Sequence, residues 1–377
     1  MPLSAHHEQI RDAVRRFARE RLAPNAARWD RDKHFPREEV AGLAGLGLCG
    51  VAIPEQWGGA GMDYTALALA CEEISAGDGS TCTILMVTNL VANIVHGYGS
   101  DAQKREFLVP LAQGKMLGAF CLTEPHAGSD AAAISTRAEK SGAHYILNGV
   151  KQFITSGKTA DLAVVFAVID KSAGKKGMGA FLVPTATPGY SVARIEDKTG
   201  QRASDTAQIV LENCKLPAAN LLAGEGQGYR IALANLESGR INVAAQATGM
   251  ARTALEAALA YAGERKSMGK TLIGHQAVNF RLADMATGVE ASRQLYLHAA
   301  QLRDSGAPCL KEASMAKLFA SETAERVCSD AIQIHGGYGY VTDFPVERIW
   351  RDVRVCQIYE GASDIQRLVI GRALEGA

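Results

Sequence analysis

The stretch HYILNGVKQFI (residues 144–154) sets the fold class of the chain. It is short, rich in β-branched and aromatic residues, and ends in a Thr-Ser-Gly turn. Four more segments of this kind are separated by Gly, Pro, Ser and Asn turns: LGAFCLTE (117–124), DLAVVFAVI (161–169), GAFLVP (179–184) and TAQIVLENCKL (206–216). Regularly spaced segments of this type are typical of an all-β domain. We therefore expect a β domain over residues 116–228.

The flanking regions have a helical character instead. Ala-rich and Leu-rich segments fill residues 1–115. After residue 229, two apolar stripes follow the helical period, namely Leu255, Ala258, Leu259 and Ala262, then Val278, Leu282, Met285 and Val289. This spacing indicates core-facing helices in a bundle. The sequence therefore predicts an α+β multi-domain protein with an N-terminal helical domain (1–115), a middle β domain (116–228) and a C-terminal helical bundle (229–377), and clefts between domains tend to bind small ligands.

Composition excludes several classes of function. Among 377 residues, 47% are hydrophobic, which allows a large core, and 40 Lys and Arg balance 40 Asp and Glu. Without a basic excess, nucleic acid is not an expected partner. The eight cysteines form no C-x-x-C pair, and the nine histidines show no H-E-x-x-H spacing. We expect buried cysteines in a reducing compartment and no metal site.

The N-terminal stretch and the most apolar internal run bear on location. MPLSAHHEQIRDAVRRFARERLAP (1–24) starts as a charged helix and lacks the apolar core of a signal peptide. The run 83–95 is shorter than the ~17–25 residues of a membrane span and carries two asparagines. We expect a soluble intracellular protein with no integral membrane segment, cytoplasmic in a bacterium or in the mitochondrial matrix if the chain is a processed eukaryotic one.

Two loops have the composition of ligand-binding loops. FCLTEPHAGSD (120–130) runs from a strand into a Pro-Gly loop with hydroxyls and free backbone N–H groups, which suits a polar planar ligand or phosphates. An ordinary β-turn has the same composition, so both interpretations stay open. GEGQG (224–228) resembles a nucleotide loop but follows no βαβ unit, and we interpret it as a hinge and not as a Rossmann motif.

A carboxylate near the C-terminus raises a separate question. In RDVRVCQIYEGASDIQRLVIGRAL (351–374), Glu360 stands between Tyr359 and Gly361, just before an amphipathic helix. Such a residue is either an acid in the first turn of that helix or a base directed into a cavity. The residues alone leave both interpretations open.

Six motifs, taken in order, resemble the acyl-CoA dehydrogenase family over nearly the whole chain. They are IPEQWGGAGMDY (53–64), TEPHAGSD (123–130), NGVKQFITSG (148–157), ERKSMGKTLIGHQAV (264–278), QIHGGYGY (333–340) and IYEGASDIQR (358–367). LKEASMAK (310–317) and IYEGAS (358–363) look like stretches of the short-chain and branched-chain members. The resemblance implies an N-terminal helical domain, a middle β-barrel or sandwich and a C-terminal four-helix bundle, which agrees with the order expected above.

The resemblance also implies bound FAD, completed by a neighbouring subunit of a homotetramer arranged as a dimer of dimers. Two positions depart from the family pattern: Phe153 replaces a common Trp, and Ala362 replaces a common Thr. The positions matching the family's cofactor contacts are Phe120, Leu122, Thr123, Gly128, Ser129, Phe153, Thr155, Arg265, Gln276, Gln333, Gly336, Gly337, Ala362 and Asp364. His335 is expected to pack beside the cofactor and not to act as an acid or base.

For an acyl-CoA substrate, the matching positions are Ser129, Glu237, Arg240, Tyr359 and Gly361. Glu237 and Arg240 are three residues apart, so we expect them to pair on one helical face. Glu360 matches the family's α-proton base, and a dry pocket would have to raise its pKa. Some members carry the base directly before the arginine of ESGR (237–240), where this chain has Gly239.

The implied function is FAD-dependent α,β-dehydrogenation of an acyl-CoA to the trans-2-enoyl-CoA, with a short or branched acyl chain. The expected electron acceptor is electron-transfer flavoprotein. The alternatives are an acyl-CoA oxidase or related flavin monooxygenase that passes electrons to O2, and a catalytically inactive helical binding protein.

Overall fold

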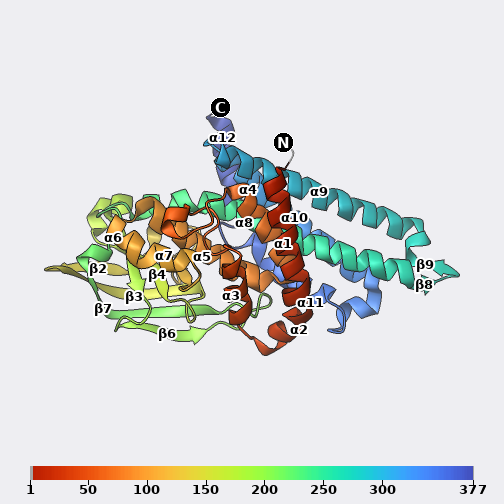
Figure 1. Cartoon of the computed structure of the whole chain (residues 1–377), viewed down its shortest axis with the longest axis horizontal. Helices are drawn as coiled ribbons and strands as arrows, with labels where there is room; N and C mark the ends of the chain where they lie inside the picture. Colours follow the sequence, from red (N-terminus) through yellow and green to blue (C-terminus); the bar gives the residue numbers. More distant parts are fainter. Residues whose placement is uncertain (1–2, 377) are drawn as a thin grey trace.

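The computed structural model describes residues 3–376, in which helical segments come before and after the strands of a curled β-sheet along the chain. The strands are β1 (Gly118–Cys121), β2 (Arg137–Ser141), β3 (His144–Thr155), β4 (Leu162–Val168), β5 (Met178–Pro184), β6 (Tyr190–Ile195) and β7 (Thr206–Pro217). Their order is β1-β4-β2-β3-β7-β6, with β5 on β4. The sheet lies at one end of the elongated molecule (Figure 1). The α+β fold class predicted from the sequence is confirmed.

The N-terminal helices cover one side of the sheet and reach the bundle. They are α1 (Ala5–Phe17), α2 (Ala23–Asp32), α3 (Arg37–Gly45), α4 (Tyr64–Gly77), α5 (Gly79–Tyr98), α6 (Asp101–Gln103) and α7 (Val109–Ala112). Helix α5 packs on both β1 and the bundle helix α8. Among residues 3–376, α5 is the one helix that meets the length and composition of a membrane span, and 83% of its apolar window is buried inside the protein.

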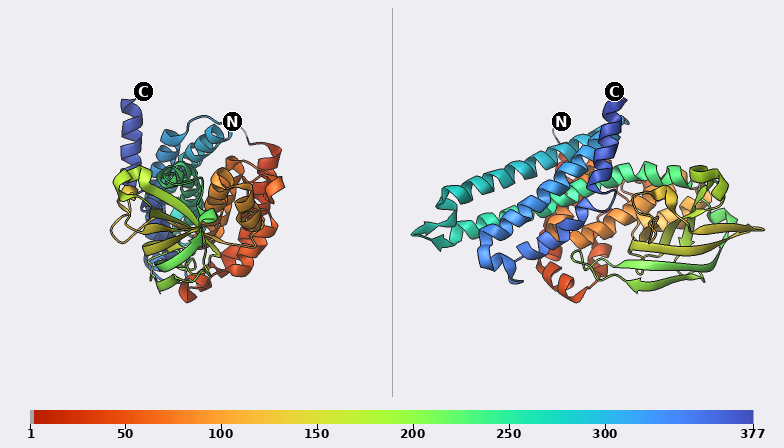
Figure 2. Two further views of the ribbon diagram at one scale, coloured as in Figure 1. Left: turned by 90° about the vertical axis from the view of Figure 1, so that its left-hand side faces the viewer. Right: turned by 180° about the vertical axis from the view of Figure 1, so that it is seen from behind.

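Long helices form the other end of the molecule. They are α8 (Gly228–Glu264), α9 (Gln276–Asp304), α10 (Leu310–His335), α11 (Val346–Val353) and α12 (Ser363–Glu375). Helices α8, α9 and α10 pack on one another, α4 packs across α8 and α9, and α12 contacts α10. Figure 2 shows α12 projecting from the bundle and the β8–β9 hairpin (Lys266–Ser267 and Lys270–Thr271) at its far tip.

The two apolar stripes predicted in the bundle differ in outcome. Leu282, Met285 and Val289 are buried and Val278 packs against the same core, so this stripe is confirmed. In the other stripe, Leu259 is 47% exposed, and its assignment to the core was wrong. Ala258 and Ala262 on the same half of α8 are fully buried, so Leu259 lies at the edge of the buried face. All eight cysteines are buried, and none forms a disulfide within residues 3–376.

Candidate active site

Glu360 lies on a short irregular link between the 3₁₀ turn Arg354–Gln357 and α12. Its φ is +52° and that of Gly361 is +86°, so two consecutive residues adopt left-handed backbone. A non-glycine residue in this region is strained and needs surrounding contacts to hold it. Helix α12 begins later, with Ala362 as its N-cap and Asp364 as the acid of its first turn. Glu360 is therefore not a first-turn helix acid.

The Glu360 carboxylate points into the protein, against α8. Its Oε2 atom is buried and has no hydrogen-bond partner within the described part of the chain. A Cβ built on Gly239 of α8 would lie 2.9 Å from Glu360 Cδ and closer still to Oε2. Burial raises the pKa of Glu360 to about 7, although the Lys317 and Arg240 cations act in the opposite direction. A carboxylate with these properties can act as a base at neutral pH.

Two cations face this carboxylate from different helices. Lys317 on α10 is fully buried, and its Nζ donates to the Gly361 carbonyl at 2.7 Å. Arg240 on α8 is 6% exposed and donates from Nη1 to Ser314 Oγ at 3.1 Å. Burial lowers the pKa of Arg240, and the Glu360 charge opposes that shift. The Arg240 charge therefore favours the ionised form of the Glu360 carboxylate.

The predicted pair of Glu237 and Arg240 does not form, which corrects the expectation from helical spacing. Glu237 Oε1 instead accepts from Arg303 Nη1 of α9 at 2.7 Å and from Cys309 Sγ at 3.1 Å. The guanidinium of Arg303 also lies 4.2 Å from the centre of the Tyr64 ring. Helix α9 supplies a nearer cation than the neighbouring turn of α8, so tertiary contact overrides the i, i+3 spacing.

Tyr359 links the Glu360 region to the β domain through a buried polar network. Its hydroxyl donates to Gln246 Oε1, and Gln246 Nε2 donates to Thr83 Oγ1 at 2.7 Å. Thr83 Oγ1 in turn donates to Gln201 Oε1 of the β6–β7 connection at 2.5 Å. Because these residues come from α5, α8 and the β domain, the predicted base lies where all three regions meet.

The β domain exposes the aromatic ring of Phe153 and holds the start of the 122–129 loop by hydrogen bonds. The β3–β7 register slips between Lys151 and Ile154, and the resulting bulge leaves Phe153 at φ +56° with its side chain 62% exposed. Bulges re-aim side chains in this way. Directly beside it, Gln152 N donates to the Thr123 carbonyl at 2.8 Å, and Lys151 Nζ donates to the Leu122 carbonyl at 3.1 Å.

The remaining predicted cofactor positions of this half vary in exposure. Phe120 packs on Phe166, with ring centres 5.0 Å apart, and Leu122 is buried, so contact there would come from the backbone. Gly128 and Ser129 lie exposed on the loop, and Thr155 is half-buried. Ala362 caps α12 without a side-chain hydrogen bond, in keeping with its missing hydroxyl.

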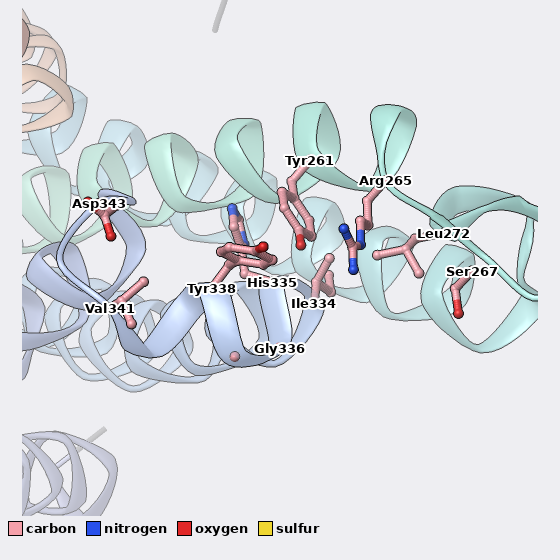
Figure 3. Close-up of a pocket in the computed structure, with 11 residues that line it drawn as sticks. Tyr261, Arg265, Ser267, Leu272, Ile334, His335, Gly336, Tyr338, Val341 and Asp343 are labelled. Atoms are coloured by element: carbon pink, nitrogen blue, oxygen red, sulfur yellow. The ribbon is translucent and has the colours of Figure 1, made fainter.

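A second group of predicted residues lines an open pocket of about 600 Å³ near the far tip of the bundle (Figure 3). Arg265 lies over the Tyr338 ring at 5.7 Å, and Gly336 and Gly337 have open space where a Cβ would stand. The His335 ring stacks on Tyr261 at 4.4 Å, and its Nδ1 donates to the Ala331 carbonyl, as expected for a packing residue. Gln276 and Gln333 are exposed at the ends of α9 and α10 and are not among the lining residues.

The Glu360 link and the second group of predicted cofactor residues are far apart within one chain. Gly239, beside Glu360, and Glu264, next to Arg265, both lie on α8. About 25 residues of helix separate them, which is roughly 37 Å at 1.5 Å per residue. The Glu360 link and the pocket beside Arg265 therefore lie at separate places in one chain.

Several residues of the site escaped the sequence reasoning. Lys317, Gln246 and Gln366 are fully buried, and each hydrogen-bonds on or beside the Glu360 link. Lys317 carried a usable signal, because it falls on the same helical face as Ala313 and Ala320, where a charge is out of place. Within residues 3–376, no cluster of three or more His, Cys, Asp or Glu residues could hold a metal ion.

Comparison with known proteins identifies relatives over nearly the whole chain. Models of the N-terminal, middle and C-terminal domains of acyl-CoA dehydrogenase match residues 4–115, 119–214 and 226–375. An acyl-CoA dehydrogenase of Bacillus subtilis is 45% identical over 377 residues, covering 100% of both chains. The chain belongs to the acyl-CoA dehydrogenase family. It is an oxidoreductase that dehydrogenates acyl-CoA thioesters.

Other family members narrow the comparison. The human mitochondrial short-chain specific acyl-CoA dehydrogenase is 46% identical over 365 residues, 97% of this chain and 89% of that protein. The solved butyryl-CoA dehydrogenase of Megasphaera elsdenii superposes with a TM-score of 0.97 at 41% identity, covering 100% of this chain and 99% of that one. The family consists of flavoproteins, and a glutaryl-CoA dehydrogenase of Mycobacterium smegmatis (TM-score 0.94, 33% identity, 100% of this chain and 96% of that one) is solved in complex with FADH2.

The residues present fit a flavin dinucleotide. An exposed aromatic ring on a bulge suits a planar ring system, and the open glycines beside Arg265 leave room for a pyrophosphate, which the guanidinium fork can bind in pairs. Phe153 and the 122–129 loop would hold the ring end, and Arg265, Gly336 and Gly337 the pyrophosphate and adenine end. The first of these groups lies on the β domain and the second near the far tip of the bundle.

Proposed function

We propose that the protein catalyses FAD-dependent α,β-dehydrogenation of a short or branched acyl-CoA to the trans-2-enoyl-CoA, with Glu360 as the α-proton base. The observation that carries the proposal is the Glu360 carboxylate, whose Oε2 atom is buried without a hydrogen-bond partner within residues 3–376 and whose pKa is raised to about 7. A free glutamate, with a pKa of about 4.3, is too weak a base for a carbon acid. Burial raises the pKa of Glu360 and so makes it a stronger base than a free glutamate.

The protein groups divide the work as follows. The Glu360 carboxylate takes the α-proton, and its backbone N–H, which has no hydrogen-bond acceptor within the described residues, is available to the thioester oxygen as negative charge develops there. When bound, FAD supplies the acceptor for the β-hydrogen, which leaves as hydride. The acyl-CoA would be bound by the predicted substrate positions, which are Ser129, Glu237, Arg240, Tyr359 and Gly361. The expected partner for electron transfer is electron-transfer flavoprotein, and we propose a homotetramer with FAD sites shared between subunits.

A short acyl chain is supported by the relatives. The human relative is named short-chain specific, and the Megasphaera neighbour is a butyryl-CoA dehydrogenase. The test is anaerobic mixing of the purified holoenzyme with butyryl-CoA, followed by analysis of the thioester product. We expect flavin bleaching together with one equivalent of the trans-2-enoyl-CoA. Bleaching without an enoyl product, or no bleaching with any acyl-CoA, would overturn the proposal.

Oxygen-dependent chemistry is the competing function on the same fold. A prolyl acyl carrier protein oxidase is among the solved neighbours, with a TM-score of 0.95 at 33% identity over 99% of this chain and 100% of that one. Substrate-reduced enzyme exposed to air separates the two functions. A dehydrogenase reoxidises slowly unless electron-transfer flavoprotein is added, whereas an oxidase reoxidises at once and forms peroxide.

A further inference from the structure

Lys317 has no role in the reaction described above, yet it is fully buried on α10. Lysine is rarely buried in full unless a partner compensates the charge. Within residues 3–376 no carboxylate lies within ion-pair distance of its Nζ, and its one hydrogen-bond acceptor is the Gly361 carbonyl at 2.7 Å. An ammonium held in this way is directed at the link that carries Glu360.

The Gly361 carbonyl also accepts a second hydrogen bond. Gln366 Nε2 donates to it at 2.7 Å and lies 3.2 Å from the Glu360 carbonyl. The two donors come from different helices, α10 and α12, and both bind the carbonyl of the residue that follows Glu360. Because Glu360 and Gly361 both have positive φ, these two hydrogen bonds stabilise a backbone conformation that glutamate seldom adopts unaided. Lys317 therefore contributes to the direction in which the Glu360 side chain leaves the backbone.

Few titratable groups influence the charges of Glu360 and Lys317. Glu360 faces Lys317 from α10 and Arg240 from α8, and both lower its pKa against the larger effect of burial. Lys317 faces Cys356, Glu360 and Glu322, which raise its pKa, and Arg240, which lowers it, while burial brings the value down to about 8. The ammonium is therefore charged below about pH 8 and neutral above it.

We propose that Lys317 is a positioning residue for the catalytic base: it fixes the Glu360–Gly361 backbone through the Gly361 carbonyl and keeps the Glu360 carboxylate ionised through its charge. This inference rests on the proposed role of Glu360. It adds a residue that acts through Glu360 and the carbonyl of Gly361.

The test compares Lys317→Met with the wild type in anaerobic single turnovers with butyryl-CoA between pH 6 and pH 9. Methionine keeps the length of the side chain and removes the charge and the donor. Because Glu360 loses a stabilising cation, more of it is protonated at low pH, and the rate at pH 6 should fall by about tenfold. At pH 9 the wild-type lysine is itself neutral, so the difference should shrink to about twofold. A deficit that is equal at both pH values, or absent at both, would overturn the proposal.

Two further variants and a second measurement sharpen the test. Lys317→Gln keeps an amide donor without the charge and should show the same deficit on the acid side. Lys311→Met removes a lysine from the first turns of the same helix, where Lys311 is exposed beside Glu312, and should leave the pH profile unchanged. Infrared titration of the Glu360 carboxylate, assigned by subtracting Glu360→Gln spectra, should show its protonation at higher pH in Lys317→Met. If Glu360→Gln itself turns over, the base assignment fails, while the infrared titration still decides whether Lys317 controls the charge of Glu360.

Discussion

Gly239 and Glu360 meet across the gap between α8 and the link before α12, where a Cβ on Gly239 would lie 2.9 Å from the Glu360 Cδ. The carboxylate thus fills the space that a side chain at position 239 would need. Position 239 is the place of the base in some members of the family. In this chain the two locations for a base exclude each other sterically, and the glycine leaves the space to Glu360.

Gly239→Ala tests this relationship directly. Alanine in a helix interior is favoured over glycine by roughly 0.5–1 kcal/mol, so the helix itself should not suffer. The added methyl group must push the Glu360 carboxylate aside, and we expect the single-turnover rate to fall at least tenfold, since small misplacements of a reacting group are costly. Gly263→Ala, on the same helix with open space around it, is the matched control and should leave the rate unchanged. Wild-type turnover by Gly239→Ala would contradict the arrangement.

Glu360→Gln removes the base while keeping the size of the side chain. Loss of general-base catalysis should slow flavin bleaching by at least ~10²–10⁴, while acyl-CoA still binds. Glu237→Gln serves as the comparison, because Glu237 is held by Arg303 and should affect binding more than rate. The measurement is anaerobic stopped-flow bleaching with butyryl-CoA. A rate within tenfold of wild type for Glu360→Gln would mean that the base lies elsewhere.

The raised pKa of Glu360 predicts a pH dependence of both activity and stability. The carboxylate must be unprotonated to act, so kcat/KM should rise as the pH passes through about 7. A raised pKa also means that the folded state binds a proton that the unfolded state releases. The stability contributed by this group is full below the unfolded pKa of about 4.3 and is lost as the pH rises through about 7. Glu360→Gln should therefore raise Tm relative to wild type at pH 8 and have little effect at pH 4. An unchanged Tm difference across this range would argue against the shift.

Sharing of the flavin site between subunits can be tested by complementation. Arg265→Ala alone should lower FAD occupancy, and Glu360→Gln alone should abolish turnover. In a mixed assembly, the Arg265→Ala chain supplies an intact Glu360 and its Glu360→Gln neighbour supplies an intact Arg265. Co-expression of the two variants should therefore recover part of the activity that neither has alone. No recovery in assemblies shown by mass analysis to contain both chains would indicate that each chain completes its own site.

Chain-length preference follows from the proposed substrate class. We expect kcat/KM to be greatest for short or branched acyl-CoAs and to fall for chains of C12 and longer. A panel from C4 to C16 with branched C4 and C5 thioesters, assayed with one electron acceptor throughout, measures it. Values that keep rising through C14 would contradict the preference.

The sequence by itself determined the order of helical and β regions and named Glu360 as the proposed base. Turn-separated β-branched segments and helical stripes depend on local periodicity, which a single chain displays in full. Glu360 could be assigned through the motif around it, because the residues on both sides are contiguous. By contrast, the same local reasoning paired Glu237 with Arg240 and buried Leu259, and both predictions were wrong.

The tertiary structure decided everything that depends on contacts between elements distant in the sequence. Arg303 of α9 forms an ion pair with Glu237, and Lys317 of α10 donates a hydrogen bond to the carbonyl of Gly361, 44 residues later in the chain. Burial raises the pKa of Glu360, and no feature of the IYEGAS stretch alone specifies how dry its surroundings are. Electrostatics and desolvation depend on distance and on what surrounds a group in space, and helical spacing constrains only the neighbours on one turn. The proposed base can therefore be named from the sequence, whereas the rise in its pKa and its contact with the Lys317 side chain through Gly361 come from packing.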